Sequence, residues 1–380
     1  MQTSVVDTPT PDCAERTVAR PFVLFRPHGT VIAGGIEDRF DRADAAAAAL
    51  RTGRVQALVG ALPFDPAHPV ALTAPHTLER TSGPVGVPSP VLPAMRVVQA
   101  IPAENTHLDR VTAALALLRS DDDDLVKVVL ARALRLRSEL PVRSADLVAR
   151  LAGNDPAGNG FAVDLTPAGD PWRGRQLIGS SPEVLIRRRG DRVTAHPLAG
   201  SAPRHADPAS DRVAGERLAE SAKNRAEHAH VVRALRSALE PLCTDLDIPR
   251  SPSLTSTRQL WHLGTSVSGR LRDPSTTALD LALAVHPTPA VCGTPTEAAR
   301  EFIRDVEGDR GFYAGAVGWC DSQGDGEWMV TIRCAVLDAD GTTLTAYAGG
   351  GIVADSDPAD ELAETSVKFG TVLDAFGVRR

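Results

Sequence analysis

Cysteine, net positive charge and long apolar runs are scarce or absent in this sequence of 380 residues. The five cysteines are widely spaced and include no C-x-x-C pair, which excludes a zinc or disulfide framework and predicts reduced thiols. The formal net charge is -7, so no basic surface is available for nucleic acid or for an anionic membrane. Any anionic ligand must therefore be bound by local positive charge.

No stretch of ~18 apolar residues occurs, which excludes a transmembrane helix. The first twenty residues carry Asp7, Asp12 and Glu15 and no apolar segment, so we expect no signal peptide and a cytoplasmic protein. The hydrophobic content of 43% and the charged content of 23% are those of a globular chain that buries a large core.

Strands and helices are expected to alternate without a regular period. Strands are predicted at 21–25, 55–64, 126–136, 314–320, 329–337 and 344–348, a hairpin at 176–186 and 192–196, and helices at 44–51, 210–243, 276–285 and 296–306. Proline-rich connections are expected at 65–104, and a glycine-rich turn at Gly349–Gly351. This irregular order excludes a solenoid and a simple doubly wound sheet. We expect a loose segment at 1–20 and a single mixed α/β (α+β) layered domain at 21–380.

The last helix carries the most informative local pattern. Asp357 followed by Pro358 predicts a helix start, because the carboxylate accepts from free amides and proline needs no partner at the first position. At about 100° per residue, Glu361, Glu364 and Lys368 share one face. This face suits a hard cation and an anionic substrate. The alternative is an exposed ion pair between Glu364 and Lys368.

A second polar face is predicted within 210–243. Lys223, Asn224 and Glu227 lie on one side of that helix. Considered alone, Glu227 could simply form a surface ion pair with Lys223.

Nine ordered motifs together make the sequence recognisable. They are Lys127-Val128-Val129-Leu130-Ala131-Arg132, Ser181-Pro182-Glu183, Pro197-Leu198-Ala199-Gly200-Ser201, Ala226-Glu227-His228, Trp261-His262-Leu263, His286-Pro287-Thr288-Pro289-Ala290, Gly324-Asp325-Gly326-Glu327-Trp328, Thr331-Ile332-Arg333 and the Glu361/Glu364/Lys368 helix. The chain resembles the chorismate-utilising enzymes over residues 97–377, and more weakly over 58–66. That family implies two β-sheets with flanking helices.

Within the family, the sequence is most similar to isochorismate synthases of the siderophore or menaquinone type. The implied reaction is an isomerisation in which water attacks C2 of chorismate and the C4 hydroxyl leaves, which needs a base and an acid. The resemblance implies Lys127 as the general base and Glu183 as the general acid. Burial that disfavours the ammonium form suits a lysine to this role, and Lys127 lies in a valine-rich strand.

The resemblance also implies a Mg²⁺ cofactor. Glu227 and Glu364 are expected as direct ligands, and Glu361 as a ligand through water. The sequence departs from the family pattern at Asn224, where an acid is usual. An amide oxygen can still accept from a metal-bound water, but it adds no negative charge.

The remaining implied residues bind the substrate. Arg333 and Lys368 are expected to hold the enolpyruvyl carboxylate, with Tyr313 as a hydroxyl partner. Backbone amides at Gly349, Gly350 and Gly351, and similarly at Gly200, are expected to approach the anion. His262 and Thr265 are expected near the ring carboxylate, and a purely structural role for His262 remains open.

Three alternatives are considered. Relatives that aminate the ring usually lack a lysine at the position of Lys127, which favours water as the nucleophile. A salicylate synthase shares this lysine and then eliminates pyruvate, but the motifs at 286–293 and 318–321 are more similar to the enzymes that stop at isochorismate. A non-catalytic chorismate-binding subunit is disfavoured by the intact set of acidic residues. No glutaminase-like segment or partner helix is apparent, so we expect a monomer.

Overall fold

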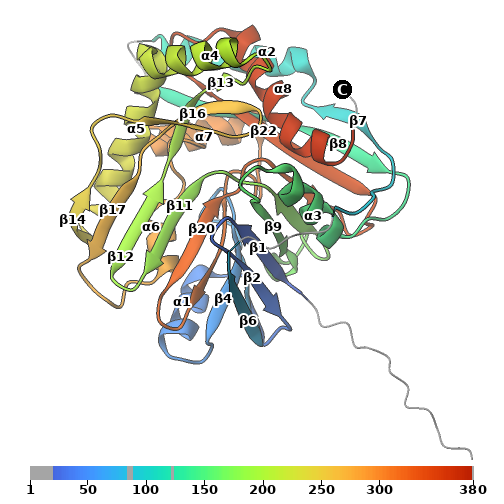
Figure 1. Ribbon diagram of the computed structural model, residues 1–380, viewed down its shortest axis with the longest axis vertical. Helices are drawn as coiled ribbons and strands as arrows, with labels where there is room; N and C mark the ends of the chain where they lie inside the picture. Colours follow the sequence, from blue (N-terminus) through green and yellow to red (C-terminus); the bar gives the residue numbers. More distant parts are fainter. Residues whose placement is uncertain (1–19, 84–88, 121–123, 379–380) are drawn as a thin grey trace, which may run out of the picture.

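The computed structural model describes residues 20–83, 89–120 and 124–378 of the chain. Their strands form two large sheets of ten and nine strands and a small sheet of three, with helices packed around them (Figure 1). The predicted mixed α/β class with two sheets and flanking helices is confirmed, and the third sheet is an addition. The predicted loose segment lies outside the described residues except for Arg20.

The first sheet contains the first and the last strands of the described chain, β1 and β22. Its strands run, in spatial order, β18 (Gly293–Thr294), β8 (Lys127–Ser138), β22 (Thr343–Ile352), β21 (Cys334–Leu337), β10 (Gln176–Gly179), β9 (Gly160–Asp164), β1 (Phe22–Arg26), β2 (Gly29–Gly34) and β6 (Thr77–Ser82), with β7 (Met95–Ile101) also paired to β8. All of these pairs are antiparallel.

The second sheet faces the first across the main core. Its order is β14 (Cys243–Asp247), β17 (Val267–Leu271), β12 (Arg192–His196), β11 (Val184–Arg189), β20 (Gly326–Val330), β19 (Ala316–Asp321), β4 (Ala57–Leu62), β5 (Ala71–Ala74) and β3 (Asp38–Phe40). The small sheet is β13 (Leu198–Pro203), β16 (Leu260–Gly264) and β15 (Ser253–Ser256). Apolar side chains such as Leu24, Leu58 and Trp328 fill the core between the large sheets.

Helices cover the outer faces. They are α1 (Ala43–Arg51), α2 (Glu104–Leu118), α3 (Ser144–Asn154), α4 (Pro208–Glu220), α5 (Ala222–Leu239), α6 (Ala278–Val285), α7 (Thr296–Glu307) and α8 (Pro358–Ala375). A second core lies between the first sheet and α3 and α8, and its buried side chains include Leu147 of α3, Phe369 of α8 and Ala346 of β22. The predicted start of α8 is confirmed, because the Asp357 carboxylate accepts from the amides of Ala359 (2.9 Å) and Asp360 (3.2 Å).

Two segments predicted from the sequence as single strands cross between the large sheets. The segment at 176–186 divides into β10 and β11, and the segment at 329–337 divides into β20 and β21. The two crossings lie side by side, since Ser180 N donates to Arg333 O (3.1 Å) and Val330 N donates to Glu183 O (3.1 Å). Glu183 and Arg333 are thereby placed at the junction of the sheets.

Three other predictions of local structure were wrong. The helix predicted at 210–243 is two helices, α4 and α5, with Ser221 between them accepting from the amide of Asn224 (3.3 Å). Residues 65–104 contain β5, β6 and β7 as well as connections. The glycine run at 349–351 is part of β22 and forms no turn.

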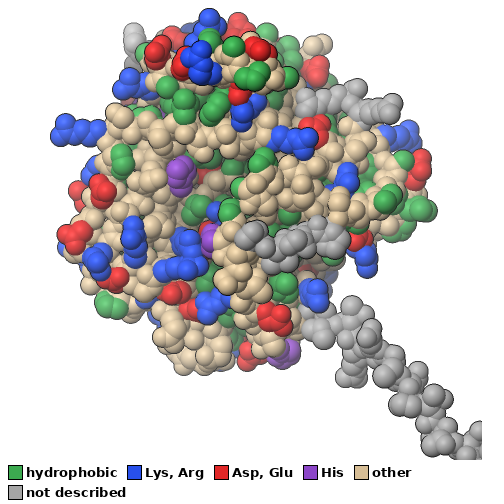
Figure 2. All heavy atoms as spheres, in the orientation of Figure 1, with side chains coloured by type: hydrophobic (Ala, Val, Ile, Leu, Met, Phe, Trp, Pro, Cys, Tyr) green, Lys and Arg blue, Asp and Glu red, His purple; other side chains and the backbone are tan. Residues whose placement is uncertain are grey.

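The sequence leads to expectations about membrane helices, cysteines and surface charge. Within the described ranges no helix is long and apolar enough to cross a membrane. The four cysteines that the structure describes, Cys243, Cys292, Cys320 and Cys334, are buried free thiols. On the face shown in Figure 2, Lys and Arg side chains are interspersed with Asp and Glu side chains and form no continuous basic surface.

Candidate active site

A pocket is lined by residues of β22, α8, α5, the small sheet and the two crossings; the arrangement of β22, α8, α5, β13 and β16 can be followed in Figure 1. Most of the predicted site residues line it, namely Glu183, Gly200, Glu227, His262, Tyr313, Arg333, Gly349, Gly351, Glu361, Glu364 and Lys368. Lys127, Thr265 and Gly350 lie just outside its lining. Residues from widely separated segments of the chain are thus brought to one place.

The glycines of β22 make this convergence possible. A Cβ atom at Gly351 would lie 2.5 Å from Glu227 Oε1 and 3.0 Å from Lys127 Cε. At Gly349 it would lie 2.7 Å from the Tyr313 hydroxyl. The two glycines therefore serve close approach by distant side chains, and turn formation is not their role.

Glu183 is a buried carboxyl group whose pKa is raised toward neutral pH. It is 3% exposed, and Leu198 N donates to its Oε1 at 3.3 Å. Burial raises the pKa of Glu183 to about 7, although the Leu198 amide and the charges of Lys127 and Arg333 act in the opposite direction. A carboxyl group in this state is suited to donate a proton to a leaving group.

Lys127 lies directly behind Glu227. Its side chain is fully buried, and its Nζ is 2.9 Å from Glu227 Oε1. This approach is a charge contact without hydrogen-bond alignment, and Nζ has no aligned partner within the described part of the chain. The surface ion pair considered for Glu227 and Lys223 does not form, because Lys223 contacts Glu361 (3.3 Å) instead.

Each of the three carboxylates expected to bind metal has a lysine partner. Lys127 contacts Glu227, Lys223 contacts Glu361, and Lys368 contacts Glu364. The Glu364–Lys368 pair considered as an exposed alternative is present, but both of its side chains line the pocket and lie in a recess.

The ionisation of Glu361 and Glu364 differs. Burial, followed by the charge of Glu364, raises the pKa of Glu361. Burial acts in the same direction on Glu364, but Lys368 and a hydrogen bond from Ser201 outweigh it and lower the pKa of Glu364. Glu364 is therefore the more firmly ionised of the two.

The oxygen donors of this recess fit a hard divalent cation. Among the described residues, no group of three or more His, Cys, Asp or Glu side chains is already arranged to hold a metal ion. Glu361 Oε2 and Glu364 Oε1 nevertheless lie 3.2 and 3.8 Å from the position that a Cβ of Gly350 would take. Glu361, Glu364 and Glu227 could hold such a cation where they now hold lysines, since carboxylate oxygens are preferred Mg²⁺ ligands.

Arg333 and His262 are neighbours in the pocket lining. Arg333 has a positive φ of 52°, and its Nη1 donates to Thr371 Oγ1 (3.3 Å). Burial lowers the pKa of Arg333 to about 10, so it stays cationic at neutral pH. His262 Nε2 lies 3.5 Å from Arg333 Nη2, and burial, then the charges of Arg333 and Lys368, lower the pKa of His262 well below its usual value. His262 is therefore a neutral acceptor.

Thr265 has a different position from the one expected. Its Oγ1 lies 2.7 Å from Nε2 of His228, a buried residue of α5 whose pKa is lowered to about 4, mainly by burial. The pair connects α5 to the segment that follows β16. Thr265 thus supports the position of α5, and it does not line the pocket.

Several lining residues were not predicted. Ser201, Lys223, Val129, Ala290, Val291 and Ile332 all face the pocket. All of them except Lys223 lie inside or next to the nine sequence motifs. Their position in or beside a motif was therefore the signal that could have identified them. The role of Lys223 had no such signal, because its partner Glu361 is 138 positions away in the sequence.

Asn224 lines the same recess. Its Nδ2 donates to Ser221 Oγ (2.9 Å), and its Oδ1 lies 3.0 Å from the position of a Cβ at Gly200. The amide oxygen therefore faces β13.

Comparison with known proteins agrees with this geometry. The family model described as "Chorismate binding enzyme" matches residues 89–377. The chain is 53% identical over 360 residues to a putative isochorismate synthase MenF of Mycobacterium tuberculosis, covering 95% of this chain and 97% of the relative. It is 42% identical over 377 residues to the isochorismate synthase DhbC of Bacillus subtilis, covering 94% of each.

A solved structure is also similar. The crystal structure of a putative 2,3-dihydroxybenzoate-specific isochorismate synthase, DhbC from Bacillus anthracis, superposes with a TM-score of 0.85 at 39% identity, covering 94% of this chain and 96% of that one. The family model and the two sequence relatives each span more than two thirds of the chain. The chain belongs to the chorismate binding enzyme family.

Proposed function

We propose that this protein is an isochorismate synthase that isomerises chorismate to isochorismate. The observation that carries the proposal is Glu183, a carboxyl group with a pKa of about 7 in one pocket with the cations Arg333 and Lys368. Chorismate is a dicarboxylate that must lose a ring hydroxyl, so it needs both a proton donor and positive charge. The printed names of the relatives support the same activity.

The proposed reaction exchanges one hydroxyl group for another. Water attacks C2, its proton passes to Lys127 in the neutral amine form, the double bonds shift, and the C4 hydroxyl leaves as water with the proton of Glu183. One water enters and one leaves, so the product is an isomer of the substrate. Lys127 and Glu183 return to their starting states by proton exchange with solvent.

Positive side chains orient the substrate in this proposal. Arg333 and Lys368 hold the enolpyruvyl carboxylate, because the Arg333 fork binds both oxygens of a carboxylate. Tyr313 lies beside Gly349, where its hydroxyl can donate to the same group. His262, as a neutral acceptor, limits the direction in which the Arg333 fork can turn.

We propose Mg²⁺ as the cofactor, held by Glu227 and Glu364 directly and by Glu361 through water. When bound, Mg²⁺ would neutralise and orient the ring carboxylate of the substrate. The oxygen-only donor set and the small number of protein ligands are those that Mg²⁺ prefers.

Product analysis tests the proposal against its alternatives. Purified protein is incubated with chorismate and MgCl₂, and the products are separated by chromatography, with pyruvate measured by lactate dehydrogenase. We expect isochorismate without pyruvate. Salicylate with an equal amount of pyruvate would establish the salicylate synthase alternative, and unchanged chorismate would establish a non-catalytic binding subunit.

Glu364→Gln should raise the Mg²⁺ concentration needed for half-maximal activity more than Glu361→Gln does. Glu364 is the more firmly ionised and is the proposed direct ligand, whereas Glu361 acts through water. The measurement is activity against Mg²⁺ concentration after EDTA treatment. Equal effects of the two variants would show that the two roles are wrongly assigned, and full activity in EDTA would contradict the metal site.

Asn224→Asp should lower the Mg²⁺ requirement without a matching gain in kcat. A carboxylate ~4–5 Å from the cation adds attraction even at an effective dielectric near 20, but it also opposes the ring carboxylate of the substrate. Activity of both proteins is titrated against Mg²⁺. Superimposable curves would show that Asn224 does not face a metal-bound water.

The pH dependence follows from the protonation of Glu183. Because the raised pKa is about 7, the proton-donating form dominates below this pH and is lost above it. We expect kcat to fall as pH rises through about 7, measured between pH 6 and 9 with saturating chorismate and Mg²⁺. A kcat that stays constant over this range would contradict the role of Glu183 as the acid.

The cytoplasmic location, the monomeric state and the single domain at 21–380 stay predictions. Size-exclusion chromatography with light scattering tests the monomeric state directly.

A further inference from the structure

Strand β8, which carries Lys127, has an interrupted edge. On one side β22 pairs with it from Val128 to Arg137. On the other side β18 pairs with Lys127 and Val128, and β7 pairs only from Ala133 onward. Val129 N still donates to Cys292 O (2.8 Å), so the edge without a partner strand runs from the Val129 carbonyl to Arg132, next to the site.

Two side chains of one short segment fill this gap. Arg310 Nη2 donates to Val129 O (2.6 Å), and Ala131 N donates to Glu307 Oε1 (2.6 Å). The same arginine donates through Nη1 to Val291 O (3.0 Å). A carboxylate and a guanidinium thus take the place of a neighbouring strand.

The two side chains also bind each other. Arg310 Nε donates to Glu307 Oε2 (2.8 Å) and Nη2 donates to Oε1 (2.9 Å). The guanidinium of Arg310 lies over the ring of Phe64, 4.7 Å from its centroid, and 6.0 Å from that of Tyr313. Both charged groups are buried, with side-chain exposures of 7% for Glu307 and 3% for Arg310.

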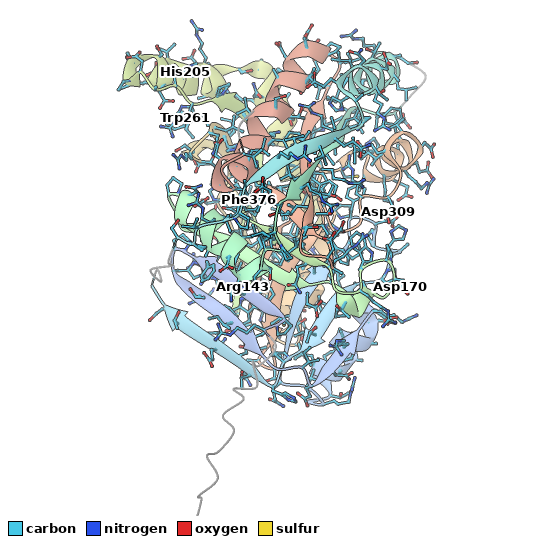
Figure 3. All side chains as sticks on the ribbon, turned by 90° about the vertical axis from the view of Figure 1, so that its right-hand side faces the viewer. Arg143, Asp170, His205, Trp261, Asp309 and Phe376 are labelled. Atoms are coloured by element: carbon cyan, nitrogen blue, oxygen red, sulfur yellow. The ribbon has the colours of Figure 1, made fainter. Side chains whose placement is uncertain are left out.

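Glu307 is the last residue of α7, and Arg310 directly follows the exposed Asp309, which is labelled in Figure 3. A buried ion pair of this kind is costly unless all of its donors and acceptors are satisfied. Here they are satisfied mainly by backbone groups of the pocket wall. That use indicates a role in positioning the wall.

The contacts of the pair lead to three parts of the pocket. Val129 and Val291 line it, and so does Tyr313, whose ring lies beside the guanidinium. Lys127 is two residues before Val129 on the same face of β8, because side chains alternate along a strand. A shift of β8 at Val129 therefore moves Lys127.

We propose that Glu307 and Arg310 are positioning residues, which fix β8 and the 291 segment so that Lys127 meets the reacting water. This inference rests on the proposed function. Neither residue lines the pocket, so both act through the wall that they hold.

Arg310→Lys tests the proposal, because lysine keeps the charge and loses the fork that joins Val129, Val291 and Glu307. We expect kcat for isochorismate formation to fall about tenfold or more, since small displacements of a catalytic group are costly. The KM for chorismate should change less than about threefold, because Arg333 and Lys368 are unaffected. Glu307→Gln keeps an oxygen for Ala131 N and should lower kcat less.

A matched control is available on α7. Arg300 is also bound to acidic side chains, Asp65 and Glu297, and its ion pairs do not involve β8. Arg300→Lys should keep the kcat of the original protein. If Arg310→Lys also kept it, the proposal would be overturned.

Hydrogen exchange without substrate gives a second readout that does not depend on the reaction. Mass spectrometry of peptides covering 124–134 should show faster exchange at the Ala131 amide in Arg310→Lys, and unchanged exchange in Arg300→Lys. Unchanged exchange in both variants would overturn the structural part of the inference. A further outcome is that the original protein makes no isochorismate while the Ala131 amide exchanges faster in Arg310→Lys than in the original protein. In that case the proposed function would fail and the packing role of the pair would stand.

Discussion

Lys127→Gln should lower kcat by about 10²- to 10⁴-fold, the range by which general base catalysis contributes. The loss should fall on kcat, because Lys127 acts in the transition state and the cations that hold the substrate, Arg333 and Lys368, lie elsewhere in the pocket. Initial rates and chorismate binding by calorimetry are compared in the variant and the original protein.

The fold must be checked in the same experiment. Glutamine at position 127 leaves Glu227 without its ion pair, and an unpaired buried charge destabilises a protein. A thermal unfolding curve separates this effect from lost catalysis. If turnover stayed close to that of the original protein, Lys127 would have only a structural role.

Glu183→Gln should produce a loss of similar size, about 10²- to 10⁴-fold in kcat. The amide accepts the same hydrogen bond from Leu198 N but cannot give a proton to the leaving hydroxyl. The pH dependence expected for the original protein, a fall above about 7, should disappear from any residual activity of this variant.

Glu183→Asp is the matched control. It keeps an acid but withdraws it by one methylene group, so we expect partial activity with the same direction of pH dependence. Equal activity of the Gln and Asp variants would show that proton donation by Glu183 is not required.

Local signals in the sequence were enough to predict the elements that depend only on interactions between residues close together in the sequence. Asp357 and Pro358 start α8 by capping chemistry that needs no tertiary contact. The same helix face then presents Glu361, Glu364 and Lys368 to the pocket, as their spacing predicts.

Features that depend on contacts between residues far apart in the sequence were not predictable in the same way. The break between β20 and β21 lies at Thr331–Arg333, inside a mostly apolar segment, since both strands are buried along their whole length. Periodicity cannot separate two helices with aligned apolar stripes, so the division at Ser221 was missed. The glycines of β22 were assigned to a turn, because their true constraint comes from Tyr313 and Glu227, remote in sequence.

The partners within the site were likewise hidden. Lys127 and Glu227 are far apart in the sequence, and only the fold places the two side chains 2.9 Å from each other. The family resemblance named both residues but not their contact. Their pairing is the addition that the structure makes to the site.

The most direct test of the account is the origin of the new hydroxyl group. Turnover in H₂¹⁸O should give isochorismate with one ¹⁸O atom, at the C2 hydroxyl, because water is the nucleophile and the C4 hydroxyl is lost to solvent. Mass spectrometry of the isolated product measures the label. Isochorismate without ¹⁸O would show that the hydroxyl is transferred within the molecule, and it would contradict the assignment of Lys127 and Glu183 as base and acid.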